Sequence, residues 1–136
     1  MSSEESSRSR FAAQIEQQAA TARACLERIR SGEPAGLTEM KQFWHQMKRA
    51  GASTGVPAVT VLGSALEALC DIWQRARAAG REHPDSARLM KEALDLLPAL
   101  AGGEVPQGRG KLKQLCARAD ELTQSLLQNL VTRKEI

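Results

Sequence analysis

One histidine of this sequence stands among basic residues at helical spacing. Lys41 lies four residues before His45, and Lys48 and Arg49 lie three and four residues after it. Residues three and four apart share one face of an α-helix, so a helix here would surround the imidazole with cations. Imidazole is a nucleophile, and cations stabilise a phosphoryl group once it is attached. An ordinary solvated helix face is the default interpretation of this pattern, and the cations make a histidine that accepts a phosphoryl group the alternative to test against it.

The residues around His45 have the apolar period of a helix. Its apolar positions are three, four and three residues apart, at Leu37, Met40, Trp44 and Met47. On a helical wheel, His45 points about 140° away from the centre of this stripe, toward the outside of a bundle. We expect this helix to run from about residue 34 or 36 to 50 and to break over 51–55, where glycine, serine and threonine gather.

Four further segments carry apolar residues three and four apart. They predict helices over about 11–30, 56–79, 84–100 and 111–131. Pro98 should kink or end the third of these, and residues 102–110, with four glycines and one proline, should form a loop. Together the five amphipathic helices predict an all-α, antiparallel up-down bundle, with a four-helix core and one additional helix.

Composition narrows the class of protein. The chain has 136 residues, of which 42% are hydrophobic and 26% charged, as in one soluble domain. A net charge of +3 is too small to indicate nucleic acid, and no apolar stretch approaches the ~20 residues that span a bilayer. Three widely separated cysteines without metal-ligand spacing predict reduced thiols in or near the core, a cytoplasmic protein and no metal site.

We divide the chain at two points. Residues 1–10 are polar and serine-rich and predict a disordered tail. Residues 11–131 should form the bundle, and residues 132–136 a polar tail or linker. His83, beside a proline at an expected helix start, is interpreted as a solvated or capping residue.

The run 45–59 resembles the signature of histidine phosphotransfer (HPt) domains. That pattern has a histidine, an apolar residue two positions later, a lysine three later, small residues and a glycine ten later, followed by a second helix. The matching residues are His45, Met47, Lys48 and Gly55. The family's second helix typically carries an apolar–glutamate pair, which here would be Leu66 and Glu67. Residues 25–33 are similar to the family's preceding helix and turn, and the resemblance covers about 11–100.

The resemblance implies phosphorelay in two-component signalling. HPt domains accept a phosphoryl group from a receiver-domain aspartate, or from a kinase, and pass it to another receiver. Here His45 would be the phosphoacceptor, Lys48 the cation near the phosphoryl oxygens and Gly55 the turn residue. The partner would contact Lys41, Lys48, Arg49, Ala52 and Gly55. Such a domain is a phosphotransfer intermediate and not a stand-alone enzyme, it needs no cofactor of its own because the receiver supplies Mg²⁺, and we expect a monomer.

Two positions depart from the family pattern. Arg49 stands where the family usually has a glycine that lets the partner approach, so it either hinders docking or contacts the phosphoryl group. Trp44 is bulkier than the usual residue before the histidine and is expected to fill core. These departures leave two alternatives open. One is a degenerate, non-phosphorylated bundle that docks a signalling partner, and the other is an oligomerisation module at the N-terminus of a larger regulator.

Overall fold

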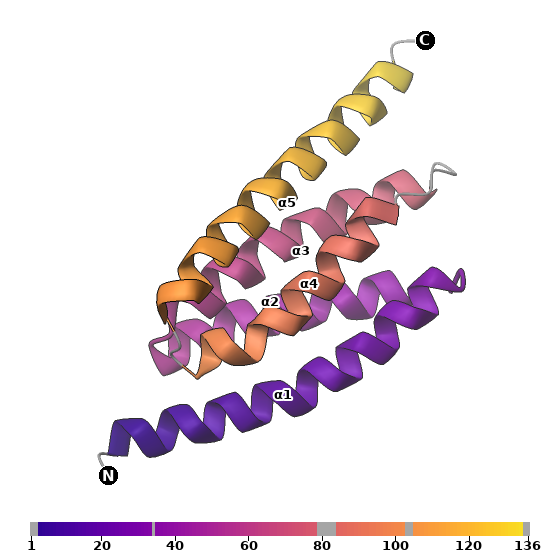
Figure 1. The fold of residues 1–136 in the computed structure, drawn as a ribbon. Helices are drawn as coiled ribbons and strands as arrows, with labels where there is room; N and C mark the ends of the chain where they lie inside the picture. Colours follow the sequence, from indigo (N-terminus) through magenta and orange to yellow (C-terminus); the bar gives the residue numbers. More distant parts are fainter. Residues whose placement is uncertain (1–2, 34, 79–83, 103–104, 135–136) are drawn as a thin grey trace.

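The part of the chain that the structure describes, residues 3–33, 35–78, 84–102 and 105–134, consists of five helices (Figure 1). The structure is a computed structural model. In chain order the helices are α1 (Ser3–Arg30), α2 (Ala35–Thr54), α3 (Pro57–Ala78), α4 (Pro84–Ala101) and α5 (Val105–Lys134). Successive helices run in opposite directions and pack on one another. The predicted all-α, antiparallel up-down bundle is therefore confirmed.

Left-handed glycines end the first two helices. Gly32 follows α1 with φ 103°, and Gly55 follows α2 with φ 72°. Beyond Gly55 the amide of Val56 donates to the carbonyl of Gly51 at 2.8 Å. A left-handed residue followed by a bond back over five residues caps the last carbonyls of a helix, and glycine adopts that conformation without a steric penalty. Gly55 therefore makes the turn between α2 and α3 that the sequence predicted.

One hydrophobic core joins all five helices. The stripe of α2 is buried throughout, and Trp44 is fully enclosed. The indole N–H of Trp44 donates to the sulfur of Met90 in α4 at 3.2 Å, so its polar atom has a partner inside the core. Helix α1 packs on α2 and α4, while α3 contacts α2, α4 and α5. Trp44 fills core, as expected from its place on the stripe.

Glycines bring α2 and α3 into backbone contact. A Cβ atom on Gly51 would lie 2.5 Å from Oγ1 of Thr60, and one on Gly63 would lie 2.7 Å from the amide nitrogen of Lys48. Real Cβ atoms do not approach other atoms so closely, so these two positions need hydrogen in place of a side chain. The absence of side chains here lets α3 lie directly against the turn of α2 that carries His45.

Two boundary predictions at the ends of the chain differ from the structure. Residues 3–10 are helical and continue α1 toward the N-terminus, whereas we expected residues 1–10 to be disordered. The serines and glutamates of this segment are compatible with a helix, and only an apolar stripe is missing there. Helix α5 likewise continues to Lys134, into the segment expected to be a polar tail or linker.

Glycine-rich segments produced the other boundary errors. Residues 51–54 belong to α2, and residues 105–110 belong to α5, so the predicted break starts too early and the predicted loop ends too late. Glycine costs a helix only about 1 kcal/mol, which packing overrides. Pro106 is the second residue of α5, where a missing N–H costs nothing. Pro98 lies inside α4, which ends one turn later at Ala101.

Helix α5 packs within the molecule, as predicted. Its side chains Leu115, Ala119 and Leu126 are buried against α3 and α4. The three cysteines are free thiols: Cys25 and Cys70 are buried and Cys116 is half-buried, which confirms their placement in or near the core. Among the described residues, no helix is long and apolar enough to cross a membrane.

Candidate functional site

His45 lies on the outer face of α2, with 47% of its side chain exposed. The opposite face of this helix carries the buried stripe, so the fold itself holds the imidazole at the surface. This is the position that the helical wheel predicted. His83, the other histidine of the sequence, lies outside the described residues.

Glu67 of α3 joins His45 and Lys48 of α2. Its Oε1 lies 3.0 Å from Nδ1 of His45, and its Oε2 lies 3.2 Å from Nζ of Lys48. Glu67 is the least exposed of the three side chains, at 21%. Partial burial alone would raise the pKa of the Glu67 carboxyl, but the hydrogen bonds from Lys48 and His45 outweigh it and hold this pKa below its ordinary value. Glu67 is therefore a carboxylate at neutral pH.

The contact with Glu67 determines which nitrogen of His45 is reactive. A carboxylate only accepts hydrogen bonds, so Nδ1 of the imidazole must be the protonated donor. In a neutral ring the lone pair is then on Nε2, the nitrogen that Glu67 does not contact. A carboxylate behind Nδ1 also fixes the orientation of the ring, as it does in hydrolytic triads. Glu67 thus holds the exposed imidazole of His45 in one orientation and, in its neutral form, in one tautomer.

The lysines around His45 are not free cations. Lys41 donates to Asp71 of α3 at 2.9 Å, and this hydrogen bond lowers the pKa of the Asp71 carboxyl. Arg75, one turn along α3, lies 3.5 Å from the other oxygen of Asp71. The sequence predicted a histidine ringed by cations, but the carboxylates of α3 neutralise Lys41 and Lys48. The basic residues lie around His45 as predicted, but the carboxylates of α3 were not foreseen, and the surroundings of His45 are a mixed-charge seam between two helices.

Arg49 is the exception among the predicted basic residues. It is exposed one helical turn after His45, and it has no ion-pair or hydrogen-bond partner among the residues the structure describes. Ala52, on the next turn, is exposed as well, and so is Gly55 at the end of the helix. The predicted partner-contact residues thus lie on the outward side of α2, with Arg49 as a cation available to an incoming anion.

Sequence reasoning missed the role of Asp71 and took Glu67 only from the family resemblance. A signal was present: Glu67 and Asp71 are four residues apart, on one face of a helix, as cations are on the preceding helix. Pairing them requires the register of α3 against α2, and that register depends on Gly51 and Gly63. The helical period of either segment alone does not reveal this register.

The cysteines do not add a second nucleophile. Burial, helped by the neighbouring Glu39, raises the pKa of the Cys25 thiol, which donates to the carbonyl of Gly36 at 3.2 Å. Burial also raises the pKa of Cys70 and of Cys116. Nucleophilic attack requires the thiolate, which a raised pKa disfavours.

Comparison with known proteins assigns no family: no protein-family model, no curated protein and no solved structure matches the chain. The similarity to HPt domains rests on the residues from His45 to Gly55 and on the helical architecture around them.

Proposed function

We propose that this protein is a histidine phosphotransfer module that accepts a phosphoryl group on His45 and exchanges it with a receiver-domain aspartate. The observation that carries the proposal is the contact of Nδ1 of His45 with the carboxylate of Glu67. It leaves Nε2 as the nucleophilic nitrogen on an exposed helix face. No other described histidine competes for this role.

The transfer step needs only the imidazole of His45 and the aspartyl phosphate of the receiver. The Nε2 lone pair of His45 attacks the phosphorus of an aspartyl phosphate on the receiver, a P–N bond forms and the P–O bond to the aspartate breaks. The aspartate leaves as a carboxylate with the bonding electron pair. The ring keeps its Nδ1 proton and gains positive charge, which Glu67 stabilises at 3.0 Å. Onward transfer is the reverse reaction with another receiver.

Phosphoryl transfer needs positioning and charge stabilisation more than further catalytic groups. Arg49 can contact the phosphoryl oxygens without giving up a partner, because it has none among the described residues. Lys48 would first have to leave Glu67, to which it is bonded at 3.2 Å. We therefore assign Arg49 the first phosphoryl contact and Lys48 a second one. The Mg²⁺ that the reaction uses is assigned to the receiver.

The test is incubation with a receiver carrying a labelled aspartyl phosphate. Label on this protein should be acid-labile and base-stable, as phosphohistidine is. His45→Gln should abolish labelling and leave helicity unchanged, because the side chain lies at the surface and not in the core. His83→Gln is the matched control and should be labelled normally. Full labelling of His45→Gln would overturn the assignment.

A second function is favoured by one observation. Arg49 projects from α2 where the HPt pattern has glycine, and a bulky side chain there can keep the reacting groups apart. In that case the protein docks a receiver without being phosphorylated. Binding of a receiver to both wild type and His45→Gln, with no label on either, would identify this non-phosphorylated interaction bundle.

A further inference from the structure

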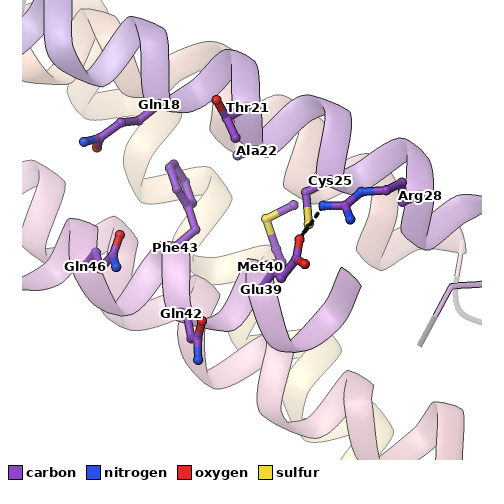
Figure 2. A pocket seen from close by; sticks show the side chains of 10 residues that line it. All are labelled: Gln18, Thr21, Ala22, Cys25, Arg28, Glu39, Met40, Gln42, Phe43 and Gln46. Atoms are coloured by element: carbon purple, nitrogen blue, oxygen red, sulfur yellow. Dashed lines mark hydrogen bonds and ion pairs between the residues drawn. The ribbon is translucent and has the colours of Figure 1, made fainter. Parts of the chain in front are cut away.

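A pocket of about 290 Å³ lies between α1 and α2 (Figure 2). We call it the α1–α2 pocket. The residues used below are Gln18, Cys25 and Arg28 from α1, and Glu39, Phe43 and Gln46 from α2. Phe43 stands between the two helices, with Gln18 and Gln46 to one side and the Arg28–Glu39 pair to the other. This pocket is separate from the seam with α3 that holds His45.

Charged ligands do not suit this lining. Its one cation, Arg28, is bonded to its one carboxylate, Glu39, so neither is free to neutralise a ligand of opposite charge. The thiol of Cys25 is held protonated by its surroundings and donates toward Glu39 at 3.6 Å. A phosphate, a carboxylate or an ammonium group in the pocket would have to compete with this half-exposed ion pair for its partner.

Purely apolar ligands do not suit it either. The amides of Gln18 and Gln46 have no hydrogen-bond partner among the described residues, so water satisfies them in the open pocket. An apolar ligand would remove that water and replace it with nothing, which is unfavourable for each amide. The lining therefore selects a neutral molecule that carries both donors and acceptors.

Phe43 and the volume determine the shape of that molecule. The ring of Phe43 is half-buried and is braced edge-on by Trp44, with the two ring centres 5.0 Å apart and the planes at 75°. A fixed aromatic ring offers a stacking surface to a planar heterocycle. A glutamine amide matches the adjacent amino donor and ring-nitrogen acceptor of adenine. A volume near the lower end of small-molecule sites fits a base or a nucleoside.

We propose that the α1–α2 pocket binds a neutral purine of the adenine type, as the base or the nucleoside. The ring stacks on Phe43, and its edge bonds with the amides of Gln18 and Gln46. This site does not depend on phosphorylation of His45.

Adenosine titrated into isotope-labelled protein, followed by NMR, tests the proposal. The expected result is saturable shifts centred on Phe43 and Gln46, with a Kd below about 1 mM for a ligand of this size. ATP should bind no more tightly than adenosine, because no cation is free for its phosphates. Absence of saturable shifts at these residues, or tighter binding of ATP, would overturn the proposal.

Variants separate stacking from fold effects. Phe43→Leu keeps most of the apolar volume and removes the ring, and it should weaken adenosine binding at least tenfold. Because Phe43 also packs on the core, Gln46→Ala, at an exposed position, is the second variant and should weaken binding about fivefold. Lys113→Ala, at an exposed position on α5 away from the pocket, should leave the Kd unchanged. Benzyl alcohol is a probe without the purine edge, and binding as tight as that of adenosine would contradict the role of the amides.

Discussion

Gly63 of α3 lies so close to Lys48 of α2 that a Cβ atom on the glycine would stand 2.7 Å from the amide nitrogen of the lysine. The same Cβ would lie 2.8 Å from the carbonyl oxygen of Trp44. Both atoms belong to the helical turn that carries His45. The two helices are thus in backbone contact at the site, and this contact sets the distance over which Glu67 reaches both His45 and Lys48.

Gly63→Ala should therefore destabilise the fold and loosen the site. The added methyl group meets backbone that cannot rotate away, and overpacking of this kind costs about 1–3 kcal/mol. Urea unfolding should show the loss, and the NMR signals of the His45 ring should move. Gly110→Ala is the control: Gly110 is helical and exposed, with nothing within 4 Å of its added Cβ, so this change should be neutral or stabilise by up to about 1 kcal/mol. Equal stability of wild type and Gly63→Ala would show that α2 and α3 can separate freely.

Glu67→Gln should make the stability depend less on pH. The pKa of this carboxyl is lowered in the folded protein. Its ionised form thus contributes stability that is fully present above the carboxyl's ordinary pKa in the unfolded chain and is lost as the pH falls through the lowered value. Since its partners His45 and Lys48 are partly exposed, we expect the unfolding free energy of wild type to exceed that of the variant by about 0.5–1 kcal/mol at neutral pH. The unfolding free energies of wild type and Glu67→Gln should converge as the pH falls through the acid range. A difference that stays constant with pH would contradict the ionic contribution.

The helices were predictable because each buries one face. The stripe through Trp44 and Met47 fixed both the core side of α2 and the outward direction of His45 before any contact was known. The ends of α2 and α5 were not predictable in the same way. Glycine is a poor helix former, so Gly51 and Gly110 each suggested a break in the helix. In the fold, Gly51 allows close packing between α2 and α3, and Gly110 lies on an exposed face of α5.

The site was predictable only in part. The position of His45 relative to Lys48 and Arg49 depends on one helix alone, so their spacing in the sequence was sufficient to predict it. The neutralisation of Lys48 by Glu67 and of Lys41 by Asp71 depends on how two helices are aligned. A local pattern of charges shows which residues can pair, and the relative placement of the helices decides which of them do.

Arg49→Gly should slow phosphoryl transfer to His45. Arg49 is exposed beside His45 and has no partner among the described residues. Loss of one solvent-exposed charge contact of about 1 kcal/mol corresponds to roughly a fivefold lower rate. The measurement is the rate of label transfer from a phosphorylated receiver at saturating receiver. Arg49→Lys keeps the charge and should retain most of the rate. Faster transfer by Arg49→Gly would mean that the side chain obstructs docking, as glycine at this position in HPt domains suggests.

Removal of α5 after Gly110 should unfold or aggregate the protein. The deleted segment contributes Leu115, Ala119 and Leu126 to the core, and its loss exposes the apolar surfaces of α3 and α4 that they cover. Loss of buried leucines costs about 2–5 kcal/mol each, against a total stability of about 5–15 kcal/mol for a typical domain. Thermal unfolding and light scattering after size-exclusion chromatography measure both effects.

A second truncation tests whether the effect comes from these buried side chains. A chain that ends at Asn129 keeps all three buried side chains, so it should retain most of the stability and stay monomeric. If the chain that ends at Gly110 were equally stable and soluble, α5 would be an outward connector despite its contacts. If the full chain formed a concentration-dependent dimer that this truncation abolished, α5 would be an oligomerisation helix. The packing of Leu115, Ala119 and Leu126 against α3 and α4 leads us to expect a monomer instead, because these apolar side chains are already covered within one chain.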